Sequence, residues 1–451
     1  MELLWTDKCF LAVLMISLII TLFSLRKEHT RRSFSRISHR PIAVSAGIIL
    51  LFFFAVGLLD SIHISPNRSN SNSEISAIEN DTVLDRLLAP LGNSYEKTYS
   101  MPLALNLYSI ETILVNGLAQ QIYPRLTYPA DTIKNNSIKK QFLVRIIAKA
   151  LISALVCLVL FWLTISIGRR LIWGDFKILP SKTAAVGLAT LFICIFVVFA
   201  SYWISRHLHL LGTGKIGQDI FYYTVKSIRT GLVIGILTTL FMLPLALIFG
   251  ISAGYFGGLI DDIIQYIYIT LSSIPGVLLI TATVLSMQTY IANHPEQFTT
   301  LSKSADARLL VLCLILGVTS WTSLCRLLRA EALKLREVDY VLAARALGSS
   351  AFTILRKHLL PNVMHIVLIT LVLDFSFLVL AEAVLSYVGV GVSPMTISWG
   401  NMINGARLEL AREPIVWWPM LAAFSLMFIL VLASNLFADA LRDAFDPHHA
   451  N

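Results

Sequence analysis

The sequence predicts an all-α protein, a polytopic integral membrane bundle of about nine transmembrane helices. Of its 451 residues, 56% are hydrophobic and only 14% are charged, whereas a soluble domain has roughly 25% charged residues. The mean hydropathy of +0.73 points the same way. A bilayer core requires about 20 mostly apolar residues per helix, and nine stretches approach or exceed that length. The candidate spans are residues 9–25, 41–59, 150–168, 184–204, 231–252, 264–287, 309–325, 363–388 and 416–437.

The first candidate span, residues 9–25, is short. It lacks a strongly basic start and an A-x-A-like cleavage site, which are the marks of a secretory signal peptide. We therefore expect an uncleaved membrane anchor. The five cysteines of the chain lie in or beside apolar runs without a CxxC pair, and we interpret them as small apolar core residues.

Basic loops predict the sidedness of the chain, because cytoplasmic loops carry an excess of Lys and Arg. The loop after the first span contains six basic residues against the single acid Glu28: Arg26, Lys27, Arg31, Arg32, Arg36 and Arg40. With this loop in the cytoplasm, nine spans place the N-terminus outside and the C-terminus inside. The same alternation places the basic loops 169–183 and 326–362 in the cytoplasm, and segment 60–142, whose charge is roughly balanced, outside.

Segment 60–142 contains a polar stretch near its start, SPNRSNSNSEIS, whose composition is typical of a linker. Apolar residues return further along, in YEKTYSMPLALNLYSIETILVNGLAQQIYP. We expect a small external subdomain with some helix, too short to form a large core of its own.

Several chemistries are excluded by the spacing of their residues. The stretch LLGTGKIGQD contains Gly214 and Lys215, but a phosphate loop requires a glycine where His209 stands and Ser or Thr where Ile216 stands. HExxH, GxSxG and Rossmann patterns do not occur, and the ten histidines are scattered. We therefore expect no catalytic residue, no metal site and no cofactor in this chain. The formal net charge of +9 is accounted for by cytoplasmic loops, so nucleic acid is not an expected partner.

The stretch YVLAARALGSSAFTILRKHLLPN, residues 340–362, interrupts the apolar pattern with a basic segment. Residues 331–345 have a helix-forming composition with apolar residues on one face. Gly348 is predicted to follow that helix in a left-handed conformation, Ser349 or Ser350 to cap a second helix, and Pro361 to end it. From the residues alone, this helix, turn and helix is either a docking loop for a partner or an amphipathic loop on the membrane surface.

The same stretch resembles the EAA loop in permease subunits of binding-protein-dependent ABC importers, in the peptide, dipeptide and nickel branch (oligopeptide permease C-type). The loop pattern is E-A-A, three residues, glycine, nine residues and I-x-L-P. Leu342 replaces its glutamate and His358 its isoleucine. In the family the loop is a coupling helix that docks into the ATP-hydrolysing subunit. The resemblance therefore assigns ATPase coupling to Ala343, Ala344, Arg345, Leu347, Gly348 and Pro361.

Further stretches are similar to the family in the same order, from about residue 205 to residue 447. Gly214 and Gln218 depart from the first of them by replacing an acid and a base. The stretches are HLLGTGKIGQD at 209–219, AGYFGGLIDD at 253–262, SSIPG at 272–276, LSYVGVGVSPMTISWGNMI at 385–403 and ADALRDAFDP at 438–447.

The resemblance implies a type I ABC importer permease core in residues 183–451, with its coupling loop at 326–362. Residues 1–182 are then an N-terminal extension with about three transmembrane helices and the external segment 60–142. A standard subunit has six spans, and whether the first core helix is 184–204 or 41–59 stays open.

The resemblance also implies partners and a role. The chain is expected in the bacterial inner membrane, as a transport subunit and not an enzyme, with ATP and Mg bound by two separate ATP-binding subunits. It forms the translocation path with a sister permease, and an external binding protein delivers a peptide-like solute. The branch leaves open whether that solute is an oligopeptide, a dipeptide, nickel or another molecule.

Two further groups of residues are candidates for function. The external stretch gives a candidate binding-protein face of His209, Gly212, Thr213, Gly217 and Asp219. Within the spans, Asp374, Glu382 and Pro275 are candidates for the translocation path, because ionisable groups in membrane helices usually face the bundle interior or water. An alternative interpretation has equal weight: Asp374 and Glu382 would only form hydrogen bonds with a neighbouring helix, and Pro275 would only kink its span.

Two other classes of membrane protein fit the composition. A secondary transporter or channel is also polytopic, but its spans more often show two related halves, and such halves are not evident in this sequence. A membrane sensor would bind a ligand through segment 60–142 and signal through loop 326–362. Only the resemblance favours the importer over the sensor. We also hypothesise that the external part of residues 1–182 helps to seat the binding protein.

Overall fold

The computed structural model describes residues 4–24, 36–63, 82–92, 94–115, 118–128, 133, 136–173, 182–298 and 300–445. These residues are predominantly helical, with one two-stranded hairpin among them, and the predicted all-α polytopic class is confirmed. Eight of the described helices are long and apolar enough to cross a membrane, by length and composition. Some exceed the roughly 20 residues that a bilayer core requires. Helix α6 (Asn136–Trp173), with 38 residues, therefore extends beyond the apolar core.

The chain forms two compact units that interleave along the sequence. Unit 1 contains Ile37–Arg229 and Ile397–Ala433, and unit 2 contains Glu2–Arg36, Thr230–Thr396 and Ser434–Asn451. Helices α8 (Ile220–Phe256) and α16 (Trp418–Phe445) each belong partly to both units. The predicted boundary between an N-terminal extension and a core after residue 182 was drawn from the sequence, and it stays a prediction.

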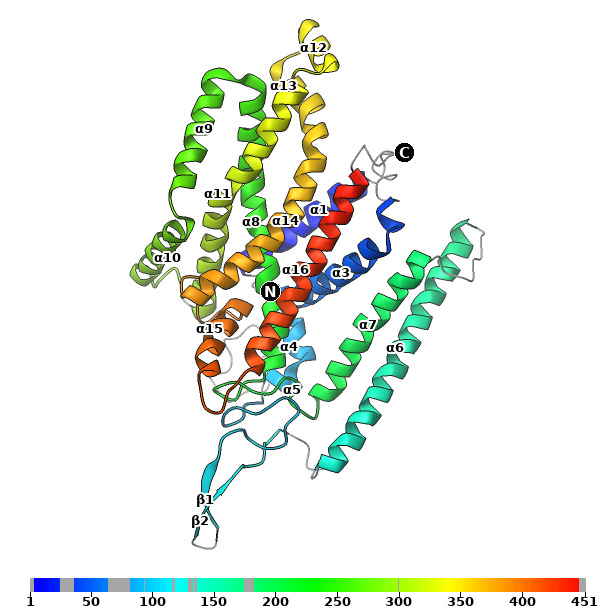
Figure 1. Cartoon of the computed structure of the whole chain (residues 1–451), viewed down its shortest axis with the longest axis vertical. Coiled ribbons are helices and arrows are strands. Elements are labelled where there is room, and N and C mark those ends of the chain that lie inside the picture. The colour runs from blue at the N-terminus through cyan, green and yellow to red at the C-terminus, as the bar shows by residue number, and fades with distance from the viewer. Residues whose placement is uncertain are drawn as a thin grey trace. The chain divides into compact units, whose positions relative to one another are not determined.

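Three long helices of unit 1 pack in series: α7 (Lys182–Ser205) contacts both α6 and α3 (Pro41–Ser61). Figure 1 shows α6 and α7 as an antiparallel pair. Small residues permit the contact with α3, since a Cβ at Gly187 would lie only 2.9 Å from a methyl carbon of Val44. Such close approach is typical of helices packed within a membrane.

The subdomain of unit 1 within segment 60–142, which was predicted to be external and is called the external subdomain below, contains two short helices and a hairpin. Helix was expected there and is found in α4 (Val83–Leu87) and α5 (Ala89–Gly92). Strands β1 (Glu111–Val115) and β2 (Leu118–Ile122) pair antiparallel, and Figure 1 shows them projecting from the rest of unit 1. The hairpin was not expected, although Asn-Gly between two apolar runs, present at 116–117, is a strong hairpin signal.

Helix α11 (Leu301–Leu335) is the centre of unit 2. It contacts α9 (Gly258–Ser273), α10 (Gly276–Asn293), α14 (Leu360–Val388) and the N-terminal helix α1 (Trp5–Ser24). It also lies against α8, where a Cβ at Gly254 would be 2.6 Å from the Arg329 carbonyl oxygen. Small residues thus bring α8 and α11 into backbone contact.

The predicted first span corresponds to α1, and its N-terminal end is fixed to α11. The Asp306 carboxylate accepts a hydrogen bond from the Thr6 backbone N–H at 3.2 Å and another from the Thr6 hydroxyl. A carboxylate at a helix N-terminus satisfies an N–H that lacks a partner within the helix and is favoured by the helix dipole. The beginnings of α1 and α11 therefore lie side by side.

The expectation of one kinked span over residues 264–287 is wrong, because the chain forms two separate helices there. Helix α9 ends at Ser273 and α10 begins at Gly276. Pro275 has no N–H for a helical hydrogen bond, and it pushes the preceding residue out of the helical region. Ile274 is accordingly extended, with φ −84° and ψ 128°, and of the two helices only α10 is long enough to be counted as a candidate span.

Candidate functional site

The predicted coupling loop, residues 326–362, contains a break between two helices that the sequence did not suggest. Its part from residue 339 to residue 359 is called the coupling segment below. One helix was expected over residues 331–345, but α11 ends at Leu335 and a separate helix α12 (Asp339–Ala346) follows. Val338 between them is extended, with φ −77° and ψ 141°. Asp339 occupies the first turn of α12, where a negative charge is favourable.

The turn after α12 is confirmed as predicted. Gly348 has φ +76°, a left-handed conformation that glycine adopts without a steric penalty. The N–H of Gly348 donates to the Arg345 carbonyl and the N–H of Ser349 to the Ala344 carbonyl, both at 3.0 Å. These two bonds define a Schellman motif, which satisfies carbonyls at a helix C-terminus. Of the two predicted caps of the second helix, Ser349 and Ser350, the structure has Ser350, whose side chain accepts a hydrogen bond from the Thr353 N–H.

Pro361 does not end the second helix, contrary to the prediction. Helix α13 (Ala351–Ile354) continues through a five-residue π segment, Leu355–Leu359, directly into α14. Leu360 stays helical before the proline, with φ −52° and ψ −47°. The π segment changes the hydrogen-bond register and places Pro361 in the first turn of α14, where the missing N–H is tolerated. The coupling segment is thus joined to α14 by continuous helix.

One face of the coupling segment is anchored and the other is exposed. Val341, Ile354 and Leu359 are buried in an apolar cluster of unit 2 that includes Tyr255. Figure 1 shows α12 at the same end of this unit as the turn between α8 and α9. The opposite face presents Leu347, which is 85% exposed. Tyr340, Leu342, Ala343, Arg345, Gly348 and Phe352 are also exposed, with Pro361 exposed further along and Ala344 half-buried.

An ion pair that the sequence analysis did not single out braces this end of unit 2. The Arg329 guanidinium on α11 donates two hydrogen bonds, both 2.6 Å, to the two carboxylate oxygens of Asp261 on α9. Hydrogen bonding to Arg329 lowers the pKa of Asp261. A bidentate pair of this kind fixes orientation as well as distance, so α9 and α11 are held together beside the coupling segment.

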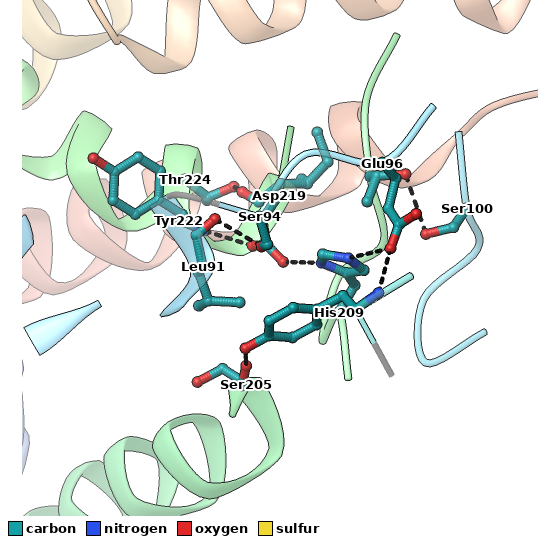
Figure 2. A network of polar contacts seen from close by, with 12 residues as sticks. Leu91, Ser94, Glu96, Ser100, Ser205, His209, Asp219, Tyr222 and Thr224 are labelled. Atoms are coloured by element: carbon teal, nitrogen blue, oxygen red, sulfur yellow. Dashed lines mark hydrogen bonds and ion pairs between the residues drawn. The ribbon is translucent and has the colours of Figure 1, made fainter. Parts of the chain in front are cut away.

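A buried charge network lies in unit 1, at the stretch predicted to face the binding protein. His209 is fully buried; its Nδ1 lies 2.6 Å from the Asp219 carboxylate and its Nε2 lies 3.7 Å from that of Glu96. Figure 2 shows the imidazole between the two acids. Burial alone would lower the pKa of His209, but the hydrogen bond that it donates to Asp219 and the charges of both acids raise it to about 9. The imidazole is therefore protonated at neutral pH.

Glu96 belongs to the external subdomain and was missed by the sequence analysis. Burial alone would raise its pKa, but His209 and the backbone N–H groups of Thr127 and Tyr128 lower it to about 2. Those N–H groups donate at 3.1 and 2.7 Å. The network thus joins the external subdomain to the loop 209–219 through one imidazole and two carboxyl groups.

The backbone of loop 209–219 is fitted against the same subdomain. Gly217, with φ +77°, has no room for a side chain, because a Cβ would lie 1.7 Å from the Glu96 carbonyl oxygen. Gly212, with φ +73°, is also confined, because a Cβ would lie 2.3 Å from the Ser100 carbonyl oxygen. The Thr213 hydroxyl donates to the Thr98 carbonyl at 2.8 Å, and the Trp418 indole N–H donates to the Thr213 carbonyl at 3.0 Å.

The five residues of the candidate binding-protein face are all buried inside unit 1: His209, Gly212, Thr213, Gly217 and Asp219. In loop 209–219 the exposed residues are Lys215 and Ile216. The buried five shape the loop, and any direct contact with a binding protein falls to exposed neighbours. The role of this loop in docking stays a prediction.

A second polar cluster joins the subdomain to α8. The Lys226 ammonium lies 2.7 and 2.8 Å from the two carboxylate oxygens of Asp85, and the Tyr222 hydroxyl donates to Asp85 at 2.6 Å. Burial would raise the pKa of Asp85, but Lys226 and Tyr222 lower it. Asp85 and Lys226 are 141 residues apart in the chain, which is why no local sequence pattern reveals the pair.

The three candidates for the translocation path have different environments in unit 2. Glu382 is 2% exposed and accepts a hydrogen bond from Ser386, one turn further along α14, at 2.8 Å. Asp374 is half-buried, and its Oδ2 has no hydrogen-bond partner among the described residues. Pro275 is exposed between α9 and α10. Asp374 is therefore the one carboxylate of the two whose hydrogen bonding is incomplete in the described part of the chain.

Comparison with known proteins finds similarity over the C-terminal half of the chain. Residues 246–450 match the family described as binding-protein-dependent transport system inner membrane component. The chain is 32% identical over 239 residues to the dipeptide transport system permease protein DppC of Lactococcus lactis subsp. cremoris, covering 53% of this chain and 64% of that protein. It is 32% identical over 240 residues to the glutathione transport system permease protein GsiD of Pectobacterium atrosepticum, covering 53% and 72%.

A longer alignment joins the chain to the oligopeptide transport system permease protein OppC of Bacillus subtilis, with 28% identity over 294 residues. It covers 61% of this chain and 90% of that protein. In the DppC comparison from Lactococcus lactis, the aligned part of this chain spans just under two thirds of the relative.

Proposed function

The chain belongs to the family of binding-protein-dependent transport system inner membrane components, and from this premise we propose that it is a permease subunit of an ATP-driven importer of a peptide-like solute. The observation that carries the proposal is the coupling segment 339–359. It combines an anchored face, a fixed Schellman turn and an exposed apolar surface.

The partners of this segment are two ATP-binding subunits, which hold ATP and Mg, so no cofactor is assigned to this chain. Leu347 at 85% exposure and Phe352 at 71% supply the apolar surface that enters a groove of such a subunit. Burying one leucine side chain stabilises a contact by about 2 kcal/mol. Because α13 continues through the π segment into α14, movement of the docked segment is transmitted directly along α14.

The translocation path runs between this chain and a sister permease, and α14 is the helix that links the path to ATP hydrolysis. Asp374 lies fourteen residues into α14, roughly 21 Å along its axis at 1.5 Å per residue. That depth places a carboxylate well inside the membrane, where ionisable groups usually face water or a partner. Glu382 supports α14 from within through Ser386, and the break at Pro275 lets α10 move separately from α9.

An external binding protein delivers the solute to the external subdomain. The accessible parts are the β1–β2 hairpin and the exposed residues Lys215 and Ile216. Dipeptide, glutathione and oligopeptide systems are named among the relatives, and for this chain the substrate is proposed only as a peptide-like solute.

The proposed location is the bacterial inner membrane, with several passes, the N-terminus outside and the C-terminus in the cytoplasm. The contact of Thr6 with Asp306 supports this orientation, since it brings together the beginnings of α1 and α11, which both lie outside in the charge-based topology. A secondary transporter, a channel or a sensor is the competing proposal, and none of them requires an ATPase.

The deciding experiment is purification of the tagged chain from its native membranes in mild detergent, followed by identification of co-purifying subunits. We expect an ATP-binding subunit in the complex, and we expect Leu347→Asp to release it. Loss of the apolar contact together with burial of an unpaired charge corresponds to about 3 kcal/mol or more, roughly a hundredfold in affinity.

Leu301→Asp is the matched control, because Leu301 is also highly exposed, at 73%, but stands at the other end of α11 from the coupling segment. It is expected to leave the complex intact. A chain that purifies without an ATPase, or with an ATPase that Leu347→Asp does not release, would contradict the proposal.

A further inference from the structure

A cluster of cations lies at one end of the α6–α7 hairpin, beside the external subdomain. The Lys149 ammonium on α6 lies 5.8 Å from the ring centre of Trp203 on α7, and the Arg206 guanidinium lies 4.8 Å from the ring centre of Tyr202. The His207 ring packs edge-on against Phe142 with centroids 5.0 Å apart. The proposed function uses none of these side chains.

The cations of this cluster lack acidic partners in the described part of the chain. Lys149 and Arg206 are both exposed and form no ion pair among the described residues. The two cations stack on Trp203 and Tyr202, which are adjacent residues of α7, and burial together with their positive charges lowers the pKa of His207. Positive charges held together by aromatic rings and not by carboxylates leave a site suited to an anion.

The geometry of α6 separates the cluster from its basic neighbours. Arg145 is four residues before Lys149, hence on the same face and one turn away. Lys140 is nine residues before Lys149, and at about 100° per residue it lies on the opposite face. Lys139 is occupied, because its ammonium donates to the Leu103 carbonyl at 3.0 Å.

Exposed apolar side chains continue directly from the cluster along α6. Ile152 is 62% exposed, and Leu155, Val156 and Leu160 are also exposed. Only 17% of the most apolar part of this helix is buried inside the protein. Lys149 and Arg206 therefore stand where the membrane-spanning surface meets the polar end of the hairpin, with Tyr202 and Trp203 at the level that aromatic residues favour in membranes.

The charge-based topology places this end of the hairpin outside, against the general bias. Lys and Arg are enriched on the cytoplasmic side of membranes, yet residues 136–149 contain four of them and no acid. A basic cluster on the external side therefore calls for a local counterion. Two exposed cations above a lipid-facing apolar strip match the chemistry of a phospholipid, whose phosphate is anionic and whose chains are apolar.

From this arrangement we propose that Lys149 and Arg206, with Arg145 beside them, bind the headgroup phosphate of an anionic phospholipid whose acyl chains lie along the exposed face of α6. Arg206 provides a planar set of donors suited to phosphate oxygens, and its stacking on Tyr202 holds that plane in place. The inference uses the proposed orientation but does not depend on ATPase coupling or on the solute. The bound lipid would fasten the α6–α7 hairpin to the membrane surface.

The test is native mass spectrometry of the full-length protein, with whatever subunits accompany it, released from vesicles of equimolar phosphatidylglycerol and phosphatidylethanolamine. We expect phosphatidylglycerol to be enriched among the retained lipids. The double variant Lys149→Gln with Arg206→Gln is expected to reduce this enrichment on the order of tenfold, since each cation near an anionic surface contributes several-fold to binding. Lys140→Gln removes the same charge from the opposite face and is expected to change nothing.

Further arms separate the competing explanations. Inorganic phosphate added in excess is expected not to displace the lipid, and displacement would indicate a soluble anion as the ligand. If the double variant does not fold, brominated phosphatidylglycerol applied to wild type and to Trp203→Phe gives the answer. Quenching that is lost with Trp203 supports the site. Equal enrichment in the double variant and wild type, or equal quenching in wild type and Trp203→Phe, would overturn it.

Discussion

His209→Asn is expected to destabilise unit 1 by about 3 kcal/mol at neutral pH. The wild-type imidazole is fully buried between Asp219 and Glu96, and its pKa is raised from 6.5 to about 9. At about 1.4 kcal/mol per unit of pKa, this difference corresponds to roughly 3 kcal/mol favouring the protonated, folded form. Asparagine still offers a hydrogen-bond donor but no charge, so the two buried acids would remain without a cation.

The pH dependence of this contribution follows from the direction of the shift. A raised pKa means that the stabilisation is complete below about pH 6.5 and is lost as the pH rises through about 9. Wild-type stability is therefore expected to fall between pH 7 and pH 9.5 by about 2 kcal/mol more than that of His209→Asn. Other groups titrate in this range, but they titrate in both proteins and cancel in the difference.

The assay is thermal unfolding in detergent at several pH values, monitored by tryptophan fluorescence. Trp418 reports locally, because its indole N–H donates to the carbonyl of Thr213 in loop 209–219. His294→Asn is the matched control, because His294 is partly exposed, stacks on Tyr290 and has no acidic side chain in an ion pair with it among the described residues. Parallel pH profiles for wild type and His209→Asn, or a cost below about 0.5 kcal/mol at pH 7, would refute a protonated, stabilising His209.

Three further outcomes are expected. Gly348→Ala should lower the free energy of unfolding by only about 1 kcal/mol, the cost of a left-handed backbone, because a Cβ there meets nothing within 4 Å. Gly217→Ala should lower it several times more, since its Cβ would collide with the Glu96 carbonyl. Equal melting points for the two variants would contradict this. Asp261→Asn and Arg329→Gln should each destabilise unit 2, and a double-mutant cycle should give a coupling of about 1–3 kcal/mol; additive effects would show that the ion pair is not an energetic unit. Replacing residues 112–121 by a short Gly-Ser linker should weaken binding-protein association and solute uptake while the His209 pH profile persists, and unchanged uptake would exclude the hairpin from docking.

The local features of the coupling segment could be predicted from sequence, because each depends on a few adjacent residues. Gly348 and Ser350 act through backbone preferences and short-range hydrogen bonds, and both are found where expected. The break at Val338 and the continuity through Pro361 were missed. Both depend on tertiary support: Val341 and Leu359 are buried in the cluster around Tyr255, and this packing outweighs the local preferences.

The buried charges could not be predicted from sequence, because their partners are distant in the chain. Glu96 and His209 are 113 positions apart, as their numbers show, and each appears in isolation as an ordinary polar residue of an external segment. Only the folded structure, in which both acids lie beside His209, shows that this side chain is buried. For the same reason, the residues predicted to form the binding-protein face are buried, and the exposed candidates are instead their neighbours Lys215 and Ile216.

This internal role changes how the external subdomain must be tested. Removing all of residues 65–135 would delete Asp85 and Glu96 together, leaving Lys226 without its acidic partner and His209 with Asp219 alone. Breaking a buried pair by removing one partner costs about 3–5 kcal/mol, so lost uptake would report misfolding as readily as lost docking. The hairpin replacement retains both acids, and it therefore separates a docking platform from a structural element. The subdomain is built into the same unit as loop 209–219 and the start of α8, so its function can be resolved only by changes confined to its exposed surface.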